Sequence, residues 1–141
     1  MKKKSRRPAP PPAPPSVATD FDAWLSGRFA DGGAFTALIV IMSVEGTRVE
    51  PVASTYAHVI GDEIAWTEML SLLDSSGKPW DAVVIYAASM EKGGTLEDQA
   101  ARQTLRRIEE EILRDRRTIN AGHFFDRLGR RLRLDEVGPA N

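Results

Sequence analysis

Cysteine is absent from this 141-residue sequence. Its absence excludes a disulfide framework, a cysteine-ligated zinc site and a cysteine nucleophile. Long apolar runs are also absent. The longest one extends from Ala37 to Met42, whereas a membrane-spanning helix needs about 20 residues. A basic start is present, but prolines replace the apolar core of a secretory leader. We therefore expect a soluble, cytoplasmic protein without membrane insertion.

Acidic residues are missing from the first 19 positions, which carry five basic ones: Lys2, Lys3, Lys4, Arg6 and Arg7. Subtracting these from the 19 Lys and Arg residues of the chain leaves 14 against 20 Asp and Glu, so residues 20–141 carry a formal charge of −6. A net acidic segment is a poor general binder of nucleic acid, because phosphates need clustered cations. The basic segment leaves nucleic acid, an anionic surface or an acidic protein open as partners.

The basic segment is also rich in proline, with Pro8, Pro10, Pro11, Pro12, Pro14 and Pro15. Proline fixes φ and removes the backbone donor, which favours extended polyproline II conformation over a packed core. We predict a disordered tail over residues 1–19 and a single domain over residues 20–141. Two PxxP spacings make the tail either a ligand for aromatic-grooved modules or a spacer.

The remaining sequence alternates helix and strand signals. Apolar positions at helical spacing follow Asp20, a predicted N-cap, and two glycines end that helix. Apolar or β-branched runs predict strands, and Pro51 places the second strand at a sheet edge or a bulge. A Thr95–Asp98 capping box is expected to begin the longest helix, whose predicted buried stripe includes Leu105 and Ile112. The predicted helices are 20–31, 62–74, 96–117 and 120–128, and the predicted strands are 35–44, 48–60, 80–88 and 131–137.

This order, α-β-(β)-α-β-α-α-β, predicts a small α/β (or α+β) domain. Strands separated by helices favour crossover connections. We expect three to four strands in a mixed, partly parallel sheet with three to four helices.

One segment, residues 89–95, has features of an anion site. Lys92, Gly93, Gly94 and Thr95 lie between a predicted strand and a predicted helix. Glycines let an anion approach the backbone, a helix N-terminus supplies free N–H groups, and Lys92 adds a charge. In parallel sheets, ligands bind at this end of the strands. The segment matches neither the P-loop nor the dinucleotide-binding pattern, and nearby acids oppose an anion, so a capped helix preceded by a loop remains the alternative.

A second cluster, Arg127, Arg130, Arg131 and Arg133, is the basic patch of the acidic segment. With Phe124 and Phe125 beside it, the patch suits stacking on a nucleic-acid strand. The alternative places the two phenylalanines in the core, with the arginines spread over a helix and a strand.

Metal and acid–base chemistry have weaker support. His58 precedes Asp62 and Glu63, and His123 shares a predicted helix face with Asp126. Imidazole and carboxylate are suitable metal ligands, but no pattern brings the two histidines together. Adjacent carboxylates point apart, and no serine sits in a nucleophile elbow. We predict no metal, no cofactor and no catalytic residue.

Two functions remain open after these exclusions. The first is a non-catalytic protein-interaction or regulatory module with a tethered basic tail, which we favour. The second is a small anion- or nucleotide-binding enzyme acting at residues 89–95. A nucleic-acid accessory role through the tail and Arg127–Arg133 is a further alternative.

Overall fold

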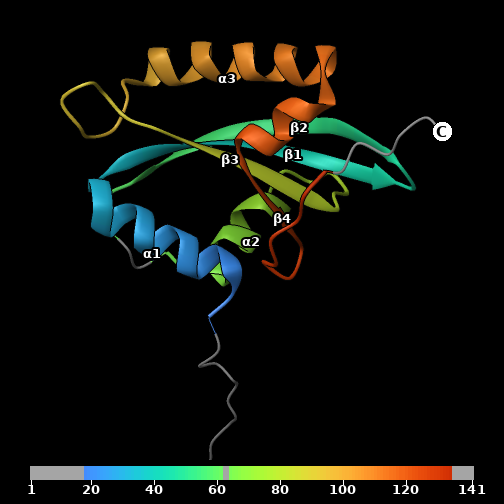
Figure 1. Ribbon diagram of the computed structural model, residues 1–141, viewed down its shortest axis with the longest axis horizontal. Coiled ribbons are helices and arrows are strands. Elements are labelled where there is room, and N and C mark those ends of the chain that lie inside the picture. The colour runs from blue at the N-terminus through green and yellow to red at the C-terminus, as the bar shows by residue number, and fades with distance from the viewer. Residues whose placement is uncertain (1–17, 62–63, 135–141) are drawn as a thin grey trace, which may run out of the picture.

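The computed structural model describes residues 18–61 and 64–134 (Figure 1). Most of the predicted tail, the Asp62–Glu63 pair and the end of the predicted last strand lie outside these residues. The elements follow one another as α1 (Asp20–Gly32), β1 (Phe35–Glu45), β2 (Arg48–Val59), α2 (Trp66–Asp74), β3 (Ala82–Ala88), α3 (Asp98–Arg114), the 3₁₀ helix η2 (Arg116–Ala121) and β4 (His123–Asp126). None of the helices described is long and apolar enough to cross a membrane.

The four strands form one sheet in the order β2-β1-β3-β4, and every neighbouring pair is antiparallel. The prediction of a partly parallel sheet is therefore wrong. The connection through α2 does join strands of the same direction, β2 and β3. However, β1 is inserted between them and pairs with both, so no two parallel strands are adjacent.

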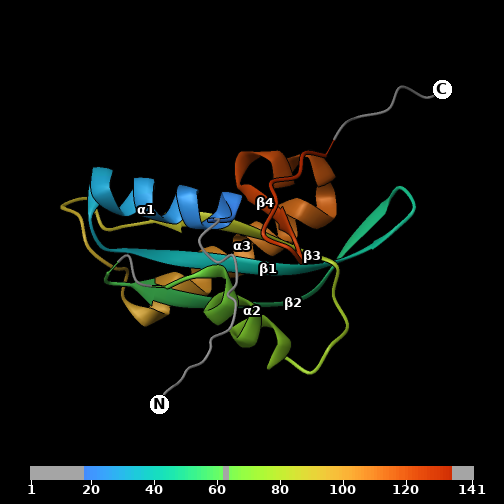
Figure 2. The same cartoon turned by 90° about the horizontal axis from the view of Figure 1, so that it is seen from below.

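Each face of the sheet is covered by helices (Figure 2). One face packs against α1 and α2 around Phe21, Ile39 and Phe125, and the other packs against α3 and η2 around Val40 and Leu105. Because successive side chains of a strand point to opposite faces, a strand covered on both faces is apolar throughout. This explains the unbroken burial from residue 35 to residue 42.

Helix starts differ from the predictions by a few residues. Thr19, assigned to the tail from the sequence, is the N-cap of α1 in place of Asp20: its Oγ1 accepts the N–H of Asp22, whose carboxylate accepts the N–H of Thr19. The predicted Thr95 capping box is absent. Glu97 occupies the N-cap position of α3 without a side-chain hydrogen bond to the helix. The stripe with Leu105 and Ile112 buried is confirmed.

The C-terminal part differs most. The helix predicted over 120–128 is wrong, since residues 116–121 form η2 and residues 123–126 form β4. Phe124 and Phe125 are both buried, one on each face of the sheet, a pattern that a strand produces and a helix does not. Of the strand predicted over 131–137, Arg131 makes one bridge to Phe125, and residues 132–134 are not in a strand.

Candidate functional site

Residues 89–97 form the connection between β3 and α3. Gly93 and Gly94 have φ of +94° and +93°, values that favour glycine. The N–H of Gly93 donates to the carbonyl of Met90, and the N–H of Met90 donates to the carbonyl of Gly94. The connection is thus a closed turn, with Lys92 exposed at its surface.

This connection is fastened to the sheet through Thr36, a buried polar side chain of β1. Its Oγ1 accepts the N–H of Leu96 at 2.8 Å and lies 2.9 Å from Nδ1 of His58. Nε2 of His58 lies 3.0 Å from a carboxylate oxygen of Asp98 at the start of α3. A carboxylate only accepts, so Nε2 of His58 carries a hydrogen and donates it to Asp98. Neighbouring strands and the α3 start are joined in one chain of hydrogen bonds.

The chain Thr36–His58–Asp98 resembles a nucleophile–base–acid series in composition only. Thr36 is fully buried, and its hydroxyl is already hydrogen-bonded to both His58 and Leu96. A nucleophile must meet its substrate, so this arrangement suits a structural fastening. Hydrogen bonds from His58 and Tyr56 hold the pKa of Asp98 below its usual range.

The anion-site residues are therefore placed as follows. Lys92, Gly93 and Gly94 belong to the closed turn, and Thr95 precedes the cap of α3 instead of forming it. The rule for parallel sheets does not apply in an antiparallel one. Anion binding by these four residues stays one of the two hypotheses for this segment, beside a capped helix preceded by a loop.

The four arginines of the basic patch make separate contacts. Arg127 stacks on Trp80 at 4.2 Å and pairs with Asp74, at the end of α2. Arg130 pairs with Asp126 at 2.8 Å. The remaining two, Arg131 and Arg133, line a hollow with Asn120, Gly122, Phe124 and Leu132. Both phenylalanines of the region are buried, so neither offers a face for stacking on a base.

The two histidines lie in separate environments. The ring of His123 stacks on Trp24 with a centroid distance of 4.5 Å, and burial, aided by the charge of Arg131, lowers its pKa. His123 and Asp126 are on a strand, so the shared helix face predicted for them is wrong. Among the described residues, no three His, Asp or Glu side chains come together as a metal site.

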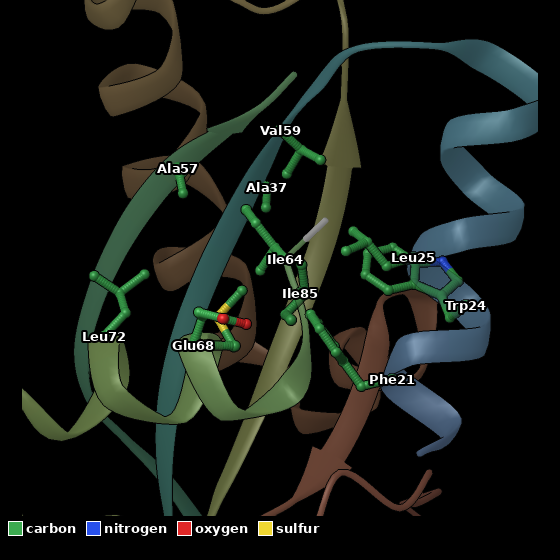
Figure 3. Close-up of a pocket in the computed structure, with 11 residues that line it drawn as sticks. Phe21, Trp24, Leu25, Ala37, Ala57, Val59, Ile64, Glu68, Leu72 and Ile85 are labelled. Carbon is green, nitrogen blue, oxygen red and sulfur yellow. The ribbon is translucent and has the colours of Figure 1, made fainter. Parts of the chain in front are cut away.

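A small apolar cavity of about 100 Å³ lies between α1 and α2 over the sheet (Figure 3). Pockets for cofactors and drug-sized ligands measure about 300–1,000 Å³, so this cavity has room only for an apolar side chain or a comparably small group. Its lining comes from both helices, three strands and the segment before α2: Phe21, Trp24, Leu25, Ala37, Ala57, Val59, Ile64, Glu68, Met69, Leu72 and Ile85.

The outer edge of β2 is a further candidate surface. In the part of the chain that the structure describes, β2 pairs only with β1. Its residues 51–59 contain no Asp, Glu, Lys or Arg, and residues 51–58 are half-buried. Edge strands usually carry features that prevent pairing with another strand, and in β2 these lie at one end only. There, Pro51 and a register shift opposite Ile41 and Met42 interrupt the ladder. The prediction that Pro51 marks an edge or a bulge is thus confirmed on both counts.

On the α3 side of this edge lies a groove. Its polar lining residues are Ser54, Thr55 and Tyr56 from β2 and Arg102, Arg106 and Glu109 from α3. Sequence reasoning found β2 and Pro51 but missed the edge as a surface. The missed signal was the nine-residue run 51–59 without a formal charge, in a chain where 28% of residues are charged.

Comparison with known proteins yields no relative: no family model, no curated protein and no solved structure matches this chain.

Proposed function

We propose that this protein is a non-catalytic interaction module that binds a protein partner by strand addition at the outer edge of β2. The observation that carries the proposal is the unprotected, uncharged edge over residues 53–59. An edge strand presents a row of backbone N–H and C=O groups, and a partner strand pairs with them directly. The cavity between α1 and α2 lies beside this edge through Ala57 and Val59, so an added strand can place an apolar side chain near its mouth.

The arrangement of polar groups supports a non-catalytic role. Thr36, His58 and Asp98 are engaged with one another, and the hydroxyl of Tyr86 donates to the carbonyl of Thr118. Burial raises the pKa of Tyr86, and the charge of Glu111 adds to this effect. That hydroxyl therefore stays protonated at neutral pH, which suits a hydrogen-bond donor within the fold.

The test places a charge in the middle of the edge. Thr55→Lys places a charged side chain in the middle of the edge, which opposes pairing with an added strand, whereas Thr47→Lys makes the same change in the exposed turn between β1 and β2. Full-length wild-type and variant proteins are used to capture partners from nuclease-treated lysate, with quantification by mass spectrometry. Partners retained by wild type and Thr47→Lys but lost by Thr55→Lys support strand addition. Capture by all three alike contradicts it.

Two further arms separate the alternatives. Removing residues 1–17 leaves the Thr19 cap of α1 in place, so a loss of partners specific to this variant assigns binding to the tail. Partners present only without nuclease treatment assign binding to nucleic acid. Thermal unfolding of each variant confirms that the fold persists.

A further inference from the structure

We propose that the partner strand at the β2 edge is the β2 strand of a second copy of this chain, paired antiparallel about a two-fold axis. This inference rests on the proposed function and names its partner. A two-fold interface brings the same patch of both copies together, so the patch must complement itself. The charges beside the edge meet this condition.

α3 runs opposite to β2: Asp98, at its start, contacts His58 near the end of β2, and Glu109 accepts a hydrogen bond from Ser54 near the middle of the strand. Two β2 strands paired antiparallel therefore place two α3 helices side by side and antiparallel. The start of one helix then lies along the end of the other.

The charges along α3 change sign. Three arginines precede three consecutive glutamates, listed in order as Arg102, Arg106, Arg107, Glu109, Glu110 and Glu111, and the end residues Asp98 and Arg114 also carry opposite charges. In an antiparallel helix pair, the arginines of one copy lie along the glutamates of the other. A parallel arrangement would place like charges together, so the charge pattern favours the two-fold one.

Some of the charged side chains of α3 face the β2 edge. Arg102, Arg106, Glu109 and Leu113 are spaced i, i+4, i+7 and i+11, which places them on one stripe of a helix. The first three line the groove beside β2. Arg106 is exposed and makes no ion pair within residues 18–61 and 64–134. Leu113 is 58% exposed on the same stripe, so its apolar side chain is available for burial between copies.

On its opposite face, the β2 edge carries small side chains. Ala53, Thr55 and Ala57 point to the α1–α2 face, in register with the buried Ile41, Ile39 and Ala37. These small side chains let a second strand approach without a clash. Leu72 of α2, 40% exposed, lies beside them in the cavity lining. A second copy would thus meet apolar groups on one face and alternating charges on the other.

The test is a charge exchange between Arg106 and Glu109, with full-length protein analysed by sedimentation velocity over a range of concentrations. Wild type is expected to show a concentration-dependent dimer. Arg106→Glu makes both edge positions acidic, and Glu109→Arg makes both basic. Each variant alone should dimerise about tenfold more weakly, because a favourable pair becomes a repulsive one at two symmetric places.

Mixing the two variants supplies the decisive readout. An acidic copy and a basic copy complement each other, so the equimolar mixture should form a heterodimer at least as tight as the wild-type dimer. A purely structural role of either residue gives no such rescue. Arg107→Glu and Glu110→Arg make the same changes on the outward side of α3 and serve as controls that should leave dimerisation unchanged.

Three outcomes would overturn the inference in distinguishable ways. A wild-type protein that is monomeric at every attainable concentration, but loses captured partners on Thr55→Lys, has an interacting edge whose partner is another protein. A monomer without any edge-dependent partner contradicts both this inference and the proposed function. A dimer that ignores the charges at positions 106 and 109 but responds to the controls contradicts the β2 interface.

Discussion

The two outer edges of the sheet, β4 and β2, differ in what lies beside them. Beyond β4 the chain turns back on itself: the N–H of Leu132 donates to the carbonyl of Phe124, and the N–H of Asp126 donates to the carbonyl of Arg130. α1 closes over this turn, since the N–H of Phe21 donates to the carbonyl of Gly129. β2 has twelve residues against four in β4, yet in the described chain no strand pairs with the outer side of β2.

We relate this difference to two properties of an edge: its contribution to folding and the availability of its backbone groups for pairing. The β4 edge is built into the core, with Phe125 fully buried and in ring contact with Phe21 and Trp66. A covered edge has no free backbone groups to offer, whereas the β2 edge keeps its own over an uncharged stretch. We infer that the C-terminal turn stabilises the fold and that β2 is kept open for pairing.

The largest expected effect tests the stabilising role of the β4 side. Phe125→Ala should lower the free energy of unfolding by about 3–5 kcal/mol, as large-to-small changes in a core do. Tyr56→Ala on β2 should cost about 1–2 kcal/mol, because that half-buried ring loses partial burial and a hydrogen bond with Arg102. Urea unfolding at pH 7 measures both. Equal losses would mean that the two edges contribute alike to the fold.

The sequence anticipated the middle of this sheet better than its edges. Phe35–Glu45 and Ala82–Ala88 were predicted within two residues because strands covered on both faces are apolar throughout. The direction of pairing was not predictable in this way, since it depends on which strand lies between β2 and β3. Nor was the covered edge, because β4 has only four residues and its two adjacent phenylalanines also fit a helix.

The candidate site was anticipated less well than the fold. Lys92 and the two glycines were found by local pattern, but the contacts that fasten them are distant in sequence: Thr36 lies 60 positions before Leu96, and His58 lies 40 before Asp98. No periodicity in a single chain reports such pairs. The charge pattern of α3 was visible in the sequence, but its position beside the β2 edge was not, because that position is set by the fold.

A smaller effect compares one carboxylate from each side. Burial acts to raise the pKa of Asp126, but N–H groups of Arg130 and Leu128 and the Arg130 guanidinium outweigh it and lower the pKa. The pKa of Asp98 is also lowered, by His58 and Tyr56. Because the folded pKa lies below the unfolded value of about 3.9, the stabilisation is complete above about pH 5 and is lost as the pH falls through the folded pKa.

Asp126→Asn should therefore flatten the loss of stability between pH 5 and pH 3, measured by urea unfolding at several pH values. Asp98→Asn should flatten it less, since the Asp98 side chain is 65% exposed and the Asp126 side chain 17%, and solvent screens the exposed group. A larger effect of Asp98→Asn would show that the fastening at the β2 end contributes more to folding than the closure at β4.

The smallest expected effect concerns Lys92, which lies in the turn preceding α3, the helix that flanks the β2 edge. The nearby N–H groups of Gly93 and Leu96 already donate within the fold, and Glu97 and Asp98 place carboxylates at the helix start. We expect inorganic phosphate and ATP to leave the melting temperature unchanged, and Lys92→Ala to behave as wild type. Lys78→Ala, also an exposed loop lysine, is the control.

A ligand at a hundredfold excess over its Kd would add about 2.7 kcal/mol of stability, so a submillimolar site would be visible with tens of millimolar phosphate. A salt-sensitive rise in melting temperature that disappears in Lys92→Ala but persists in Lys78→Ala would establish an anion site here. The β2 side of the molecule would then bind an anion in addition to the proposed partner strand.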